Sequence, residues 1–130
     1  MRTVVVTGGK RGIGAAISAH FAAAGDTVHA LSSADCDVTD EVAVGEVFER
    51  IGPVDVLVNN AGISSSAPLA RTTLDDWRSQ MDVNATGAFL CTRAVLPGML
   101  ERGSGRIVTV ASTAGRAGAR YTLNCEEPVN

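Results

Sequence analysis

The glycine-rich segment Thr7–Gly14, with the sequence TGGKRGIG, has the residue types and the position of a phosphate-binding turn. It lies between an apolar run, Thr3–Val6, and an alanine-rich run, Ala15–Ala24. Glycines let the backbone approach an anion closely, and the N-terminus of a following helix offers N–H groups with partial positive charge. The segment therefore predicts a nucleotide-binding site.

The turn alone is a weak signal, because Gly8, Gly12 and Gly14 are spaced more widely than in the common G-x-G-x-x-G pattern. A tight turn without a ligand remains an alternative. A P-loop fits less well, because its Lys is followed at once by Ser or Thr. Here the basic pair is followed by Gly12 and Ile13.

The elements that must position this turn follow from the apolar pattern. The expected strands cover Thr3–Val6, Thr27–Leu31, Cys36–Val38, Val54–Val58 and Arg106–Ala111. The first expected helix covers Gly12–Ala24 and ends at Gly25, and the second covers Asp40–Arg50 with Thr39 as its N-cap. The third covers Asp75–Met99 and begins with Thr73 in a capping box. We expect this third helix to bend near Gly87 and to end near Pro97-Gly98.

This alternation of strands and helices, without hairpin signals, predicts an α/β fold. We expect a Rossmann-like doubly wound parallel sheet with helices on both faces. Such sheets bind ligands at the carboxyl ends of their strands, near the switch in strand order. The glycine turn, Ser32, Asp37, Asn60 and Ser112 all lie at the ends of expected strands, so we expect them at that edge.

Composition narrows the function classes. The 130 residues carry a net charge of −3 without a basic run, so neither nucleic acid nor a membrane is an expected partner. Cys36, Cys91 and Cys125 have no metal-ligand spacing, so no metal site is expected. The odd number of scattered cysteines fits a reducing compartment, and we expect a cytoplasmic protein.

Further motifs follow the glycine turn in a characteristic order. They are Asp37-Val38, Asn59-Asn60-Ala61-Gly62, Val83–Phe89 and Arg106–Ser112. Together with the turn, they resemble the classical short-chain dehydrogenase/reductase superfamily over Thr3–Gly118. Bacterial 3-oxoacyl-acyl-carrier-protein reductases and polyketide-type ketoreductases are the nearest kinds. The resemblance implies an NAD(P)-binding Rossmann domain over residues 1–120, in which the C-terminal strands and helices of the family are missing.

The resemblance implies that the diphosphate of a dinucleotide lies at the glycine turn. Asp37 would face the adenine ring with Val38 beside it, although Asp37 can also be an ordinary polar residue at a loop start. The expected cofactor-binding residues are Gly8, Lys10, Arg11, Gly12, Ile13, Gly14, Ser32, Asp37, Val38, Asn60, Ala61 and Gly62.

The cofactor type can be argued from charge. Dinucleotide sites for NAD usually place a carboxylate at the end of the second strand, on the ribose 2′-hydroxyl. Ser32 occupies that position here, and Asp35 comes a few residues late. Lys10 and Arg11 can supply positive charge to a 2′-phosphate, unless they are ordinary solvated side chains. This favours NADP(H) over NAD(H).

The resemblance also implies catalytic roles. Asn84 would hold a water of the proton relay, and Ser112 would hydrogen-bond a substrate carbonyl. Each has a local alternative, since both side chains can bond to nearby backbone instead. The family's Tyr-x-x-x-Lys pair is absent, because its two positions, counted from Ser112, fall on Cys125 and Val129.

The only tyrosine is Tyr121 and the only lysine is Lys10, so no shift of alignment restores the pair. We interpret residues 121–130 as an aberrant or disordered tail, as a frameshift or a truncation would produce. By ancestry the chain is expected to be an NADP(H)-dependent reductase of a ketone or 3-oxoacyl thioester, inactive in this form. The alternatives are a non-catalytic dinucleotide-binding remnant, a partner subunit or a nonfunctional fragment. Self-association through Asp75–Met99 is expected to stabilise it.

Overall fold

The computed structural model describes residues 1–63 and 67–112. Its sheet has the parallel strands β1 (Thr3–Thr7), β2 (Thr27–Leu31), β3 (Val56–Asn59) and β4 (Arg106–Thr109), in the order β2-β1-β3-β4. Its helices are α1 (Gly12–Ala23), α2 (Glu41–Ile51), the 3-10 turn η1 (Leu69–Arg71), α3 (Leu74–Met81), the π-helical η2 (Asp82–Thr86) and α4 (Gly87–Arg102).

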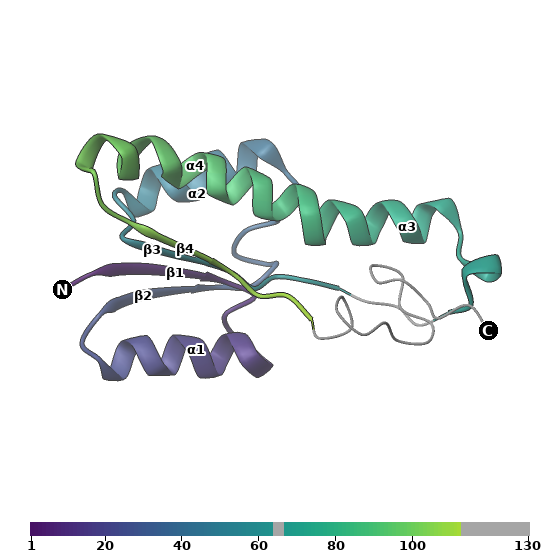
Figure 1. Ribbon diagram of the computed structural model, residues 1–130, viewed down its shortest axis with the longest axis horizontal. Helices are drawn as coiled ribbons and strands as arrows, with labels where there is room; N and C mark the ends of the chain where they lie inside the picture. The colour runs from purple at the N-terminus through teal and green to yellow at the C-terminus, as the bar shows by residue number, and fades with distance from the viewer. Residues whose placement is uncertain (64–66, 113–130) are drawn as a thin grey trace.

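Helices cover both faces of the sheet, with α1 on one side and α2 and α4 on the other (Figure 1). Val4 and Val6 of β1 belong to the cluster that contacts Ile17 and Phe21 of α1. Val5 lies in the cluster on the opposite face, with residues of α2 and α4. Successive side chains of a strand point to opposite faces, so a strand covered on both faces is apolar at every position. The predicted doubly wound α/β fold is confirmed.

The expected strand at Cys36–Val38 is wrong. The N–H groups of Asp35 and Cys36 both donate to the carbonyl of Ser32, each at 3.0 Å, which makes a turn directly after β2. Within the part of the chain that the structure describes, this segment pairs with no strand. The backbone before Asp37 therefore forms hydrogen bonds within a turn and not with a neighbouring strand.

The expected N-cap of α2 is also wrong, because it is Asp40 and not Thr39. The Asp40 carboxylate accepts hydrogen bonds from the N–H groups of Val42 and Ala43 at 3.0 and 3.2 Å. The hydroxyl of Thr39 instead donates to Asp37 at 2.7 Å. Both residues are good caps by type, and the competing contact of Thr39 decides between them.

The long helix begins as expected, since the Thr73 hydroxyl accepts from the N–H of Asp76 at 3.1 Å. Its irregularity is the π-helical turn η2, just before the expected bend at Gly87. The expected end at Pro97-Gly98 is wrong, because α4 continues to Arg102.

Pro97 removes one backbone hydrogen bond, but it does not end the helix. Val95 and Met99, on either side of it, are both buried in the core and hold this part of α4 against the sheet. The helix ends at Gly103, whose φ of 66° is the left-handed conformation that suits glycine. Apolar packing thus outweighs the local helix-breaking preference.

Three further expectations concern a membrane span, a metal site and the C-terminal tail. No helix in residues 1–63 and 67–112 is long and apolar enough to span a bilayer, and these residues contain no group of three or more metal-ligating side chains. The predicted tail 121–130, with Tyr121 and Cys125, lies outside the described residues.

We predict that Gly14→Ala destabilises the protein, whereas Gly45→Ala does not. A Cβ on Gly14 would overlap the carbonyl oxygen of Gly8 and the side-chain amide of Asn60. Gly45, also in a helix, has no neighbouring atom within 4 Å of such a Cβ. We expect Gly14→Ala to lower the free energy of unfolding by about 1–3 kcal/mol and Gly45→Ala to raise it by up to ~1 kcal/mol. Urea unfolding measures both, and equal effects would contradict the packing described here.

Candidate functional site

A cavity of about 590 Å³ opens at the carboxyl ends of β1, β2 and β3. Because β2 and β3 lie on opposite sides of β1, this is the switch point in strand order, where open α/β sheets bind ligands. Most of the expected cofactor-binding residues line it. These are Gly8, Lys10, Arg11, Ser32, Asp37, Val38, Asn60, Ala61 and Gly62.

The remaining expected residues, Gly12, Ile13 and Gly14, form the first turn of α1. Arg11 is the N-cap residue, and its side chain makes no capping hydrogen bond. The first N–H groups of a helix have no partner within the helix, so an anion can bind there. The hydroxyl of Ser18 donates to the carbonyls of Gly9 and Gly14 at 3.1 and 2.9 Å, which fixes α1 to the turn.

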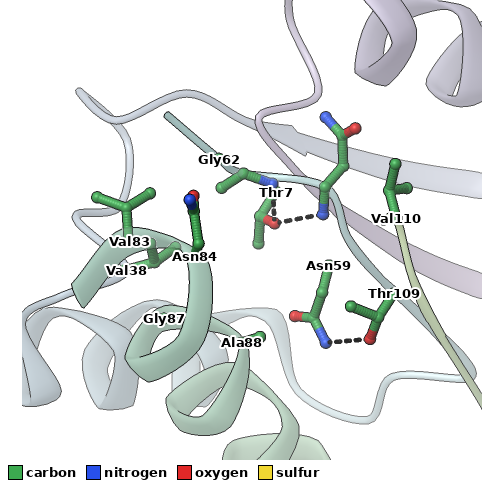
Figure 2. Close-up of a pocket in the computed structure, with 12 residues that line it drawn as sticks. Thr7, Val38, Asn59, Gly62, Val83, Asn84, Gly87, Ala88, Thr109 and Val110 are labelled. Carbon is green, nitrogen blue, oxygen red and sulfur yellow. Dashed lines mark hydrogen bonds between the residues drawn. The ribbon is translucent and has the colours of Figure 1, made fainter. Parts of the chain in front are cut away.

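The hydroxyl of Thr7 connects the glycine turn to the segment after β3. Thr7 is 2% exposed, and its hydroxyl accepts hydrogen bonds from the N–H groups of Asn60 and Ala61, both at 3.0 Å (Figure 2). The side-chain amide of Asn60 in turn donates to the carbonyl of Gly8 at 3.0 Å. Two motifs far apart in the sequence are therefore held together by three hydrogen bonds.

A smaller cavity of about 90 Å³ adjoins the first, and Thr7, Val38 and Asn60 line both. Asn84 lines the smaller cavity from η2 (Figure 2). Its amide accepts from the N–H of Ile63 and donates to the carbonyl of Ile63, both at 2.8 Å. Asn84, one of the two expected catalytic residues, thus bonds through its side chain to the backbone of Ile63.

Ser112, the other expected catalytic residue, follows β4 at the same edge of the sheet and is exposed. It is not among the residues that line either cavity. The structure therefore brings Asn84 to a cavity wall but does not bring Ser112 there.

Asn59 is a buried polar residue for which the sequence pattern predicted no individual role. It is 5% exposed, and its Nδ2 donates to the hydroxyls of Thr92 at 3.1 Å and Thr109 at 3.5 Å. These contacts join the end of β3 to α4 and β4, beside the smaller cavity (Figure 2). Its Oδ1 has no hydrogen-bond partner among the described residues.

The expectation that no carboxylate lies at Ser32 is wrong. The structure brings the carboxylate of Asp35 back onto Ser32, whose N–H and hydroxyl both donate to it at 2.9 Å. The ammonium of Lys10 lies 2.7 Å from the same oxygen. The Lys10 contact first, and then the two Ser32 donors, hold the pKa of Asp35 well below its usual range. A carboxylate therefore stands where the sequence indicated none.

Asp37 and Val38 have different surroundings. The hydroxyl and then the N–H of Thr39 lower the pKa of the exposed Asp37 carboxyl by hydrogen bonding. Val38 is buried in the core cluster that includes α2 and α4. A Cβ on Gly87 would lie 2.6 Å from its Cγ2, so a glycine there lets α4 approach this loop closely.

Two roles were not predicted from the sequence: the hydrogen bonds by which Thr7 links two segments, and the ion pair of Asp35 with Lys10. A polar residue at the end of the buried run Thr3–Val6 was a signal for the first. The second had no sequence signal, because only the turn after β2 brings Asp35 back to Ser32.

The comparisons with known proteins agree with this geometry. Residues 30–123 match the family model described as short chain dehydrogenase. The chain belongs to the short-chain dehydrogenase family. The predicted membership, near the 3-oxoacyl-acyl-carrier-protein reductases, is confirmed.

Curated relatives include the 3-oxoacyl-[acyl-carrier-protein] reductase MabA of Mycobacterium avium, which is 40% identical over 95% of this chain. Acetoacetyl-CoA reductase of Shinella zoogloeoides is 37% identical over 95% of the chain. The chain spans 54% and 60% of the lengths of these two relatives.

Solved structures share the fold. One, a short-chain dehydrogenase from Streptomyces avermitilis, has a TM-score of 0.83 at 34% identity, over 88% of this chain and 50% of its own. A second, from Beutenbergia cavernae, is a proposed NAD(P)-dependent gluconate 5-dehydrogenase with NADP bound at low occupancy. It has a TM-score of 0.88 at 36% identity, over 94% of this chain and 58% of its own.

We predict that Thr7→Val destabilises the protein and that Thr7→Ser largely preserves it. Valine has nearly the shape of threonine but leaves the N–H groups of Asn60 and Ala61 without their acceptor. We expect a loss of about 1–3 kcal/mol in the free energy of unfolding for Thr7→Val. Serine keeps the oxygen. Urea unfolding compares the two variants, and equal stabilities would show that the hydroxyl does not join the two segments.

Proposed function

We propose that this chain is the cofactor-binding part of a short-chain reductase that transfers hydride from NADPH to a ketone, with 3-oxoacyl thioesters as the substrate class. The supporting observation is the cavity at the strand switch point, where the glycine turn and the Asn60–Gly62 segment meet. The names of the relatives from Mycobacterium avium and Shinella zoogloeoides support the substrate class.

The residues present fit a dinucleotide. A Cβ on Gly14 would overlap the carbonyl oxygen of Gly8, so the close backbone contact beside the N-terminus of α1 requires glycine at position 14. Gly8, Gly12, Ile13 and Gly14 would hold the diphosphate there. Asn60, Ala61 and Gly62 would line the nucleoside. When bound, the cofactor supplies the hydride.

Two observations support NADP(H) over NAD(H), and one opposes it. Lys10 and Arg11 line the cavity beside Ser32, and a fully charged guanidinium suits a phosphate. The Beutenbergia cavernae relative binds NADP. Asp35 opposes this preference, because its carboxylate lies on Lys10 and Ser32.

In this proposal Asn84 takes part in proton relay and Ser112 orients the substrate carbonyl. The sequence has no Tyr-x-x-x-Lys pair, which in the family supplies the phenol that protonates the product oxygen. We therefore expect the chain to bind NADPH without reducing a ketone. The alternative is a non-catalytic dinucleotide-binding remnant or a partner subunit of another protein. Either would also bind NADPH without reducing a ketone.

The test is fluorescence titration of the purified chain with NADPH and NADH, followed by an assay of NADPH oxidation with acetoacetyl-CoA. We expect saturable binding of NADPH and no turnover. Failure to bind either dinucleotide would contradict the proposed function. Turnover would show that the missing Tyr and Lys are dispensable.

A pair of variants makes the binding test specific. Arg11→Gln removes a charge from the cavity wall, and we expect it to weaken NADPH binding by about threefold to tenfold and NADH binding much less. Arg50→Gln makes the same change on α2, at a residue that lines neither of these two cavities. Equal effects of the two variants would show that Arg11 acts only through net charge.

We also propose that the chain self-associates through α3 and α4 and acts in the cytoplasm. The two helices carry exposed large apolar side chains, namely Leu74, Trp77, Met81, Phe89, Leu96 and Leu100. Such exposure marks a contact surface, and a second copy of the chain is the partner proposed. The unpaired, buried Cys36 and Cys91 fit a reducing compartment.

We predict that sedimentation equilibrium gives an average mass above that of the monomer, which rises with protein concentration. Phe89→Glu, at a side chain that is 57% exposed, should shift the distribution toward monomer because it places a charge in the contact. Val42→Glu, at an apolar side chain of α2 that is 68% exposed, is the matched control. A wild-type protein that is monomeric at every concentration would contradict self-association.

A further inference from the structure

Lys10, Ser32 and Asp35 form a small polar cluster at the edge of the larger cavity. A single oxygen, Oδ2 of Asp35, lies 2.7 Å from Nζ of Lys10 and 2.9 Å from both the backbone N and the Oγ of Ser32. Lys10 and Ser32 line the cavity, and Asp35 reaches them from the turn that follows β2. One carboxylate oxygen thus receives hydrogen bonds from an ammonium, a hydroxyl and an amide.

These donors are the kinds that bind a phosphate oxygen in other proteins. In this chain they already hold an anion. The side chains of Lys10 and Asp35 are 54% and 38% exposed, so water competes for the ion pair and it can exchange readily. An aspartate carboxyl is ionised at neutral pH, and the lowered pKa of Asp35 extends this to more acidic pH.

We propose that Asp35 is an internal competitor for the 2′-phosphate of the cofactor. It occupies the donors of Lys10 and Ser32 in the free protein and opposes a second anion at the same place. Asp35 thereby makes the preference for NADP(H) over NAD(H) smaller than the two basic residues alone would give. The inference rests on the proposed dinucleotide binding and adds a specificity-determining residue to that site.

The test compares wild-type protein with Asp35→Asn at low ionic strength. The ligands are NADPH, NADH, adenosine 2′,5′-bisphosphate and adenosine 5′-monophosphate. We expect Asp35→Asn to tighten binding of NADPH and of the bisphosphate by about threefold to tenfold, because a like charge is removed and Lys10 is released. Binding of NADH and of the monophosphate should change by less than about twofold, because neither has a 2′-phosphate.

Asp40→Asn is the matched control, because it removes the same charge from a nearby residue that lines neither cavity. Asparagine is as good an N-cap as aspartate, so α2 should be preserved. A second control is Lys10→Gln. If Lys10 is the shared partner, Asp35→Asn should bring much less gain for NADPH in the Lys10→Gln background.

The outcomes separate the inference from the function on which it rests. If wild-type and Asp35→Asn bind NADPH equally well, the competitor role is overturned and dinucleotide binding stands. A loss of NADH affinity in Asp35→Asn, without a gain for NADPH, would overturn it in favour of direct contact with the ribose. If neither protein binds a dinucleotide, the proposed function fails. A selective gain for the bisphosphate would still support the competition at Lys10 and Ser32.

Discussion

The hydroxyl of Thr7 is the contact on which the arrangement of the site depends. It supplies the acceptor for two backbone N–H groups, those of Asn60 and Ala61, where β3 ends and the chain must leave the sheet. Buried backbone groups that lose their partner are costly, so this single oxygen fixes the relative position of two loops. The amide of Asn60 completes the connection through the carbonyl of Gly8. The close approach of Gly14 to both residues then sets where α1 begins.

The electrostatics of the site follow from the same geometry. The glycine turn directs the N-terminus of α1 and two basic side chains toward one edge of the sheet, which suits an anionic ligand. The turn after β2 brings an aspartate to that edge as well. The site therefore has an attractive charge and a competing one within hydrogen-bond distance of each other. This balance, and not the basic residues alone, governs the discrimination between phosphorylated and unphosphorylated cofactors in our proposal.

Periodicity explains why much of the fold could be predicted. The run Thr3–Val6 is apolar throughout because helices cover both faces of β1, and that pattern is visible without coordinates. The errors lie where residues with similar propensities compete. Thr39 and Asp40 are both good caps, and the contact of Thr39 with Asp37 decided between them. Pro97 usually marks a helix end, but buried neighbours on both sides keep α4 intact.

By itself, the sequence determined the fold class, the family and most of the cavity wall, because these depend on local period and on motifs that are contiguous in the chain. Tertiary structure alone decided which side chains meet. The turn at residues 32–36 folds Asp35 back onto Ser32 and Lys10, and the parallel pairing of β1 with β3 brings Thr7 to Asn60. Contacts between residues distant in sequence depend on the register of strands and on loop conformation. Neither produces a periodic pattern in the sequence. The position of the Asp35 carboxylate at the edge of the larger cavity could therefore be seen only in the folded chain.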